Sequence, residues 1–112
     1  QSEHFFVTRD SYPVTKYHTL IILKRCAPSF FHLTDEEVSD FLRTLKEQEK
    51  VIKELDHTVS AFNIGINDGK DAGQSIAHLH IHMIPRRNVD MENPQGGVRG
   101  VIPEKQKYVR RK

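Results

Sequence analysis

Three histidines lie at alternate positions within five residues, at His78, His80 and His82. A β-strand has a period of two residues, so this spacing would place all three imidazoles on one face of a strand. The other face would carry the apolar residues of the same stretch, Leu79, Ile81 and Met83. Core packing does not explain such a row, because a buried imidazole needs polar partners. The pattern therefore indicates a site of chemistry, and an exposed polar face is the plain alternative.

One chemistry for this row is metal binding. A zinc ion could bind two imidazoles from alternate strand positions. It could not bind all three, because His78 and His82 would be about 13 Å apart along the strand. A further ligand would have to come from elsewhere, for example from His18, and no Asp or Glu stands beside the triplet at metal-ligand spacing. We therefore expect no metal and no other cofactor.

The second chemistry is nucleophilic catalysis on phosphorus. Neutral imidazole is a good nucleophile, and its charge changes near physiological pH. The preceding polar segment, Asn67 to Ser75, contains Gly69 and Gly73, whose backbone N–H groups could hold an anion. The Asn, Gln and Ser side chains of this segment would add neutral donors. Because it accounts for every feature, attack by a histidine on a phosphate is the favoured interpretation.

Strands and one helix must position these groups. Apolar, aromatic and β-branched residues predict strands over residues 4–8, 18–24, 59–67 and 75–85. In the third of these, Ala61, Asn63, Gly65 and Asn67 would form a small, polar face. Strands, one long helix and further strands predict an α+β fold, with a mostly antiparallel sheet of about five strands. The tail after Arg86 fits either a strand or an extended arm against a partner.

The helix prediction rests on a capping box. Thr34 would be the N-cap residue, and Glu37 would reach back to it. Leu33 and Val38 would form a hydrophobic staple across this end. Apolar residues then recur at helical spacing to about Asp56: Val38, Phe41, Leu42, Leu45, Ile52 and Leu55. We expect this amphipathic helix to cover one face of the sheet.

Composition limits the class of protein. The chain has 112 residues, which suits a single domain over residues 1–112 with a C-terminal arm at about 88–112. The longest apolar run, Leu20 to Leu23, is far too short for a membrane span. No basic region followed by an apolar stretch opens the chain, so no secretory signal is expected. Cys26 is alone, which excludes an internal disulfide and favours a reducing, cytoplasmic setting. A net charge of +2 argues against a nucleic-acid partner and allows an anionic small ligand.

The histidine row with its flanks resembles a known motif. Residues Gln74 to Ile84 are similar to the pattern that names the histidine triad (HIT) superfamily of nucleotide hydrolases and transferases, with alternating His and apolar residues after Gly-Gln-Ser. Residues 5 to 86 resemble the family. The stretches that carry this likeness are Tyr12–Ile22, Leu33–Glu37 and Asn67–Gly69, and the tail Gly96–Pro103 resembles that of bacterial and archaeal members.

The resemblance implies catalytic roles. His80 would attack the α-phosphorus of a nucleotide and form a nucleotidyl-histidine intermediate, which water would hydrolyse to a nucleoside monophosphate. His82 would bond a phosphate oxygen or the leaving atom, and Ser75 would assist the leaving group. His78 would lie behind and orient its neighbours, with His18 near it. The plain alternative for His18 is a satisfied strand histidine.

The resemblance also implies how a nucleotide would bind. Asn67 would contact phosphate, with Gln74 and Gly73 in the same loop. Asp10 would bind the ribose hydroxyls, and Leu20 would line the base pocket. The alternatives are a turn cap for Asp10 and an ordinary loop residue for Asn67.

Two positions depart from the family pattern. Tyr17 stands where glycine is frequent, and Cys26 stands where histidine is usual. The function expected is hydrolysis of a dinucleoside polyphosphate or of a nucleoside phosphoramidate, and the sequence does not decide between them. If the departures spoil the pocket, the alternative is a nucleotide-binding or signalling protein; a two-histidine zinc hydrolase is the third possibility. An exposed edge strand and the resemblance both favour a homodimer, with no nucleic-acid or membrane partner.

Overall fold

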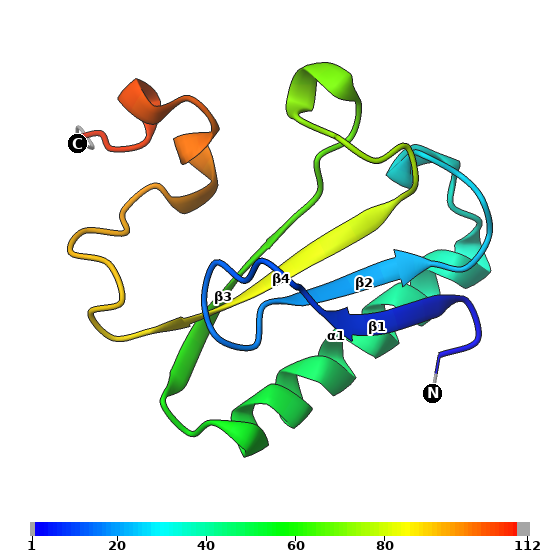
Figure 1. The fold of residues 1–112 in the computed structure, drawn as a ribbon, viewed down its shortest axis with the longest axis horizontal. Coiled ribbons are helices and arrows are strands. Elements are labelled where there is room, and N and C mark those ends of the chain that lie inside the picture. Colours follow the sequence, from blue (N-terminus) through cyan, green and yellow to red (C-terminus); the bar gives the residue numbers. More distant parts are fainter. Residues whose placement is uncertain (1, 110–112) are drawn as a thin grey trace.

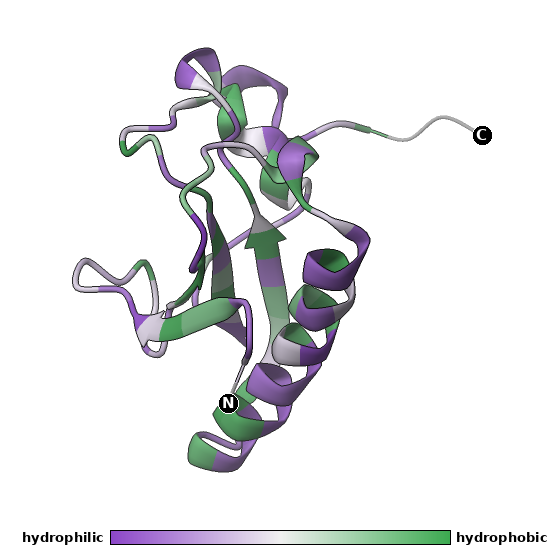
Figure 2. Ribbon diagram, turned by 90° about the vertical axis from the view of Figure 1, so that its right-hand side faces the viewer, coloured by the Kyte–Doolittle hydropathy of each residue, from purple (hydrophilic) through white to green (hydrophobic). Residues whose placement is uncertain are grey.

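The computed structural model describes residues 2–109; the basic end, Arg110 to Lys112, lies outside the described residues, as does Gln1. The fold is α+β, with one long helix on a four-stranded antiparallel sheet of order β1-β2-β4-β3 (Figures 1 and 2). The elements are β1 (Phe5–Arg9), β2 (Thr19–Leu23), α1 (Asp35–Leu55), β3 (Val59–Gly65) and β4 (His80–Arg87). The fold class is confirmed, and the described residues form four strands where about five were expected.

The core lies between α1 and one face of the sheet. Ile21, Ile81 and Met83 are buried on that face, and Phe41 and Ile52 of α1 pack against it. The alternation expected in the histidine stretch therefore holds within β4, because its apolar positions face the helix. The opposite face of the sheet is left for His80 and His82.

The predicted capping box is present at the start of α1. The Thr34 hydroxyl accepts the Glu37 N–H at 3.1 Å, and the Glu37 carboxylate accepts the Thr34 N–H at 2.9 Å. Arg25 also donates two hydrogen bonds to Glu37, each 2.9 Å long. The pKa of Glu37 is lowered to about 2, chiefly by Arg25 and then by the Thr34 backbone. The helix start is thus held by the connection after β2 as well as by its own sequence.

Only some of the apolar residues that were expected to pack α1 against the sheet are buried. Phe41 and Ile52 are buried, but Val38, Leu42 and Leu55 are exposed. The face toward the sheet instead includes Glu37, Asp40 and Thr44. Asp40 accepts hydrogen bonds from Ser2 and from the His4 backbone, which explains its burial. Val38 and Leu42, four residues apart on the helix, form an exposed stripe beside the core face.

The fourth strand begins later than predicted, at His80 rather than at residue 75. The His78 N–H donates to the Ile76 carbonyl at 2.8 Å in a tight turn. The Leu79 N–H then donates to the Ala27 carbonyl at 2.9 Å, outside β2, while the Leu79 carbonyl accepts the Leu23 N–H at 3.2 Å. His78 therefore precedes the strand that carries His80 and His82.

The tail forms two 3₁₀ turns, Gly97–Val101 and Pro103–Lys105, in place of a strand or an extended arm. Gly96 has a φ of 90°, and a Cβ there would overlap the Gln106 carbonyl, so only glycine fits this close approach. Arg99 donates to the Lys105 carbonyl at 3.0 Å and lies over the Tyr108 ring. These contacts fold the tail on itself, and its first 3₁₀ turn lies beside β3.

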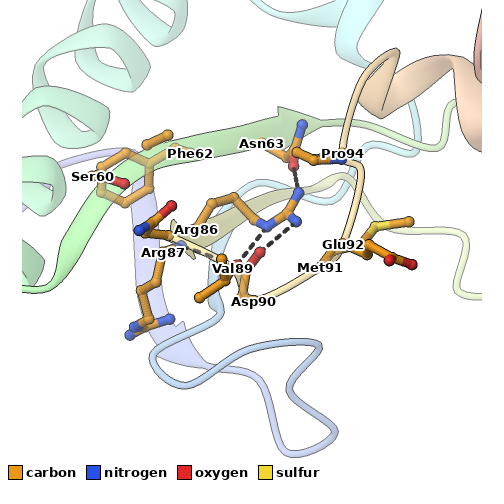
Figure 3. Close-up of a pocket in the computed structure, with 12 residues that line it drawn as sticks. Ser60, Phe62, Asn63, Arg86, Arg87, Val89, Asp90, Met91, Glu92 and Pro94 are labelled. Atoms are coloured by element: carbon orange, nitrogen blue, oxygen red, sulfur yellow. Dashed lines mark hydrogen bonds and ion pairs between the residues drawn. The ribbon is translucent and has the colours of Figure 1, made fainter.

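The turn after β4 is held by Arg86. Its guanidinium pairs with Asp90 at 2.8 and 2.9 Å and donates to the Asn63 side chain at 2.6 Å (Figure 3). A cavity of about 410 Å³ lies here, lined by β3 and the turn, and none of the triad histidines borders it. Among the described residues, no helix has the length and apolar character needed to cross a membrane.

Tyr17 occupies a backbone conformation that favours glycine, with a φ of 73°. Its ring packs beside Ile52, Val59 and Met83. Replacement by alanine removes the ring and keeps the strain, whereas replacement by glycine removes both. We expect Tyr17→Gly to be more stable than Tyr17→Ala by about 1 kcal/mol in urea unfolding. Equal free energies of unfolding for the two variants would contradict the claim that the backbone at Tyr17 is strained.

Candidate active site on the open face of the sheet

The pairing of strands places two triad histidines on the face away from α1. His80 lies opposite Ile22 of β2, and His82 lies between Leu20 of β2 and Gly65 of β3. Paired residues of an antiparallel sheet share a face, so these neighbours surround the two imidazoles. The rings of His80 and His82 are 5.3 Å apart, edge to face. One continuous polar site therefore runs along the open face of β4.

The contacts of His80 define which of its nitrogens is free. Its Nδ1 lies 2.9 Å from the backbone carbonyl of His78. A carbonyl oxygen only accepts, so Nδ1 must carry the proton. In neutral His80 the lone pair is then on Nε2. This is the protonation state that a histidine nucleophile requires.

A chain of three groups defines the proton position on His82. The Val14 N–H donates to His18 Nδ1 at 3.0 Å, which leaves the His18 proton on Nε2. That Nε2 lies 2.9 Å from His82 Nδ1, which must accept. Neutral His82 therefore carries its proton on Nε2 and can donate it in a hydrogen bond to a ligand.

Burial favours the neutral forms of His18 and His82. Desolvation lowers the pKa of His18, and the nearby Asp10 carboxylate opposes this shift. Desolvation also lowers the pKa of His82, and the neighbouring His18 and His80 lower it further. Near neutral pH, His82 is thus a hydrogen-bond donor without a positive charge.

His18 lies beside His82, not beside His78 as expected. The His18 and His82 ring centroids are 5.2 Å apart. The His78 ring instead bonds the Leu23 carbonyl at 2.5 Å, at the end of β2. His78 does orient its neighbour, but through its backbone carbonyl, which any residue would supply.

Asp10 has the role of a turn cap, which was the alternative to ribose binding. One carboxylate oxygen accepts the Tyr12 N–H at 2.8 Å, as a turn cap does. The other lies 3.5 Å from His18 Nε2, at the border of the site. Leu20 is half-buried next to His82, where it can contact a ligand.

The loop before β4 is held in place by the Gln74 side chain, which the sequence had predicted to contact a ligand. The Gln74 amide accepts the Gly69 N–H at 2.8 Å and donates to the Pro28 carbonyl at 2.9 Å. The Gly73 N–H pairs with the Lys70 carbonyl. The backbone donors expected at Gly69 and Gly73 are therefore occupied within the loop, which corrects that expectation.

Asn67 and Ser75 remain exposed at the two ends of this loop. The structure shows no hydrogen bond for either side chain within residues 2–109. Asp68, next to Asn67, accepts hydrogen bonds from Ser29 and from the Phe30 N–H, which anchors this end of the loop. The two side chains are thus free to contact a ligand from a fixed loop.

A metal ion fits this site poorly. Asp10, His18 and His82 each offer a ligand atom, and these atoms lie within 4.8 Å of one another. An ion on His18 Nε2 would move the proton of this imidazole to Nδ1. There it would face the Val14 N–H at 3.0 Å, donor against donor. The zinc-hydrolase alternative is disfavoured on this ground.

Val14 is the positioning residue that the sequence did not reveal. It acts through its backbone N–H, which every residue except proline has, so its side chain carries no signal. The pairing of His18 with His82 was also missed, because the nine residues between β1 and β2 form an irregular turn.

Comparison with known proteins finds a family match. Residues 1–89 match the model of the HIT domain. The bis(5'-nucleosyl)-tetraphosphatase (asymmetrical) of Schizosaccharomyces pombe is 40% identical over 78 residues, which cover 70% of this chain and 42% of that protein. The bis(5'-adenosyl)-triphosphatase of Dictyostelium discoideum is 38% identical, over 83% of this chain and 66% of that protein. The chain thus spans less than two thirds of either relative.

Solved structures agree in fold. The Caenorhabditis elegans NitFhit protein superposes with a TM-score of 0.75 at 38% identity, over 83% of this chain and 22% of that one. The diadenosine triphosphate hydrolase of Plasmodium falciparum gives a TM-score of 0.75 at 28% identity, over 83% of this chain and 63% of that one.

Proposed function

The chain belongs to the HIT domain family, and we propose that it hydrolyses dinucleoside polyphosphates through attack of His80 on the α-phosphorus. The observation that carries the proposal is the hydrogen bond from His80 Nδ1 to the His78 carbonyl, which leaves the Nε2 lone pair free. The names of similar proteins, two of them dinucleoside tri- or tetraphosphatases, support the substrate class.

The reaction has two steps. In the first, the His80 Nε2 lone pair forms a bond to the α-phosphorus, and the bond to the bridging oxygen breaks. The leaving nucleotide keeps that electron pair. In the second, a water oxygen attacks the same phosphorus, the N–P bond breaks, and its electrons return to Nε2. One water proton passes to solvent, and a nucleoside monophosphate leaves.

The other side chains bind and orient the substrate. His82 Nε2–H donates to an oxygen on the phosphate or to the bridging oxygen, where negative charge develops. Asn67 and Ser75 contact phosphate from the fixed loop. Asp10 binds the ribose, and Leu20 contacts the base. Gln74 and Gly73 act indirectly, by holding that loop in place.

The protonation of His82 favours a phosphate leaving group over an amine. A polyphosphate can leave as an anion with a hydrogen bond alone, whereas an amine must gain a proton. Neutral His82 has no proton to release without forming an imidazolate. We therefore expect kcat/KM for diadenosine tetraphosphate to exceed that for adenosine 5'-phosphoramidate by at least about tenfold. The reverse order, measured by chromatography of released adenosine monophosphate, would contradict the proposed substrate class.

The departures at Tyr17 and Cys26 do not favour a protein that only binds nucleotides. The Tyr17 ring packs toward the core cluster that contains Met83, on the α1 side of the sheet. Cys26 is exposed in the connection after β2. Neither residue borders the pocket beside His82.

We also propose a homodimer, in which copies associate through the free edge of β3 and the exposed stripe of α1. Among residues 2–109, β3 pairs only with β4, and Ile64 on this strand is 44% exposed. Val38 and Leu42 of α1 are also exposed. Sedimentation at micromolar concentration should give twice the chain mass of 13.0 kDa; a species of the chain mass alone would contradict the dimer. A cytoplasmic location remains a prediction from the single cysteine.

A further inference from the structure

A pocket of about 340 Å³ opens beside His82, on the β3 side. His82 forms one wall, and Ile84 continues that wall along β4. Asn67 lies at the loop end, and the tail contributes Val98 and Val101. The pocket is thus built from the sheet, the loop before β4 and the tail. Its volume lies within the range of small-molecule sites.

The missing side chain of Gly65 creates this space. Gly65 lies directly opposite His82. A Cβ added at Gly65 would meet no atom within 4 Å, and its φ is not in the left-handed region. The backbone therefore does not require glycine here. What glycine provides is open volume next to the imidazole.

The walls of the pocket favour a flat apolar group with a polar edge. Val98 and Val101 are 63% and 79% exposed, although both border a concave surface. A ligand that covered them would gain from burial of apolar surface. The Asn63 and Asn67 side chains offer amide donors and acceptors. A nucleobase has both properties.

Leu20 and Gly65 flank His82 from opposite sides. The transferred nucleotide, as proposed above, has its base near Leu20. A second nucleoside joined through phosphates at His80 and His82 would then reach the Gly65 side. The pocket is therefore placed where the other half of a dinucleoside substrate would lie.

We propose that this pocket binds the nucleoside of the leaving nucleotide, and that Gly65, Val98 and Val101 set the preference for dinucleoside polyphosphates. The inference rests on the proposed function and deepens it. A leaving group without a base gains nothing from the pocket. The attacking atom of the two steps is unchanged, because His80 does not line the pocket.

The test compares two substrates that yield the same adenosine monophosphate. Diadenosine tetraphosphate has a second base, and adenosine 5'-phosphosulfate leaves only sulfate. Gly65→Val fills the pocket with a residue that strands favour. We expect the ratio of kcat/KM for the first substrate to kcat/KM for the second to fall by at least about tenfold. An unchanged ratio would overturn the proposal, including the case in which both constants fall together.

A second variant removes the apolar wall without filling the pocket. Val98→Ser combined with Val101→Ser changes exposed side chains, so the fold should tolerate it. We expect the same ratio to fall by about three- to tenfold. Val109→Ser is the matched control, since Val109 is 91% exposed and does not line the pocket. It should leave the ratio unchanged; a fall of equal size in the control would overturn the assignment of the tail valines.

Binding without turnover separates this inference from the proposed function. In a His80→Ala background, calorimetry should show diadenosine tetraphosphate binding tighter than adenosine monophosphate by about tenfold. Added Gly65→Val should remove that advantage. If wild-type protein hydrolyses neither substrate, the proposed function fails, but the calorimetric difference still decides the pocket. Equal affinity of the His80→Ala protein for the two nucleotides would overturn the assignment of the pocket to the leaving nucleoside.

Discussion

Replacement of His80 by alanine is expected to lower kcat by at least about 10³-fold, because it removes the only attacking atom that the proposed mechanism uses. The reason is local. The His78 carbonyl fixes the Nδ1 proton at 2.9 Å and leaves Nε2 as the nucleophile. Adenosine monophosphate should still bind to His80→Ala in calorimetry, because Asp10, Leu20 and the loop are untouched.

His57→Ala is the matched control for His80→Ala. His57 is exposed in the turn after α1, away from the sheet face that carries the site. This control should keep the wild-type rate. A His80→Ala protein that retained more than about a tenth of wild-type kcat would exclude His80 as the nucleophile.

Loss of His82 should have the second-largest effect. Its Nε2–H is the end of the chain that begins at the Val14 N–H and passes through His18. One such donor to developing charge is worth about 2.7–4 kcal/mol, so His82→Ala should lower kcat by about 10²–10³-fold. Single-turnover kinetics with diadenosine tetraphosphate would measure this.

A donor in the same place should recover part of the loss at His82. His82→Gln keeps an N–H near the ligand and should be faster than His82→Ala. His78→Ala should affect the rate less than either, because the carbonyl that orients His80 belongs to the backbone. A His82→Ala rate within about threefold of wild type would show that this donor does not act in the transition state.

The sequence predicted the fold where local chemistry decides it. The Thr34 and Glu37 capping box marks the start of α1, and the apolar positions of β4 face the helix as their period requires. The sequence did not predict the features that depend on contacts between residues far apart in the chain. Asp40 is buried because Ser2 and His4 satisfy its carboxylate, a contact across 38 and 36 residues. The tail turns depend on the approach of Gly96 to Gln106, which no pattern in that segment reveals.

The sequence indicated which side chains of β4 share a face, but not the hydrogen bonds that connect the residues of the candidate site. The spacing of His80 and His82 indicated a shared face, which the strand pairing confirms. The partner of His18 and the donor at Val14 depend on how the turn after β1 folds back over β4. The paired N–H groups of Gly69 and Gly73 likewise depend on loop closure by Gln74. Such contacts are products of tertiary structure.

The most direct test of the mechanism is to trap the covalent intermediate. Wild-type protein mixed with dinucleoside polyphosphate, labelled at the α-phosphorus, should be quenched in base within one turnover, since a phosphohistidine bond survives base. The mechanism predicts labelled nucleotide on the protein, mapped to the peptide that contains His80 and absent from His80→Ala. Product formation with no label retained at any time, in a sample where His80→Ala also turns over, would contradict it.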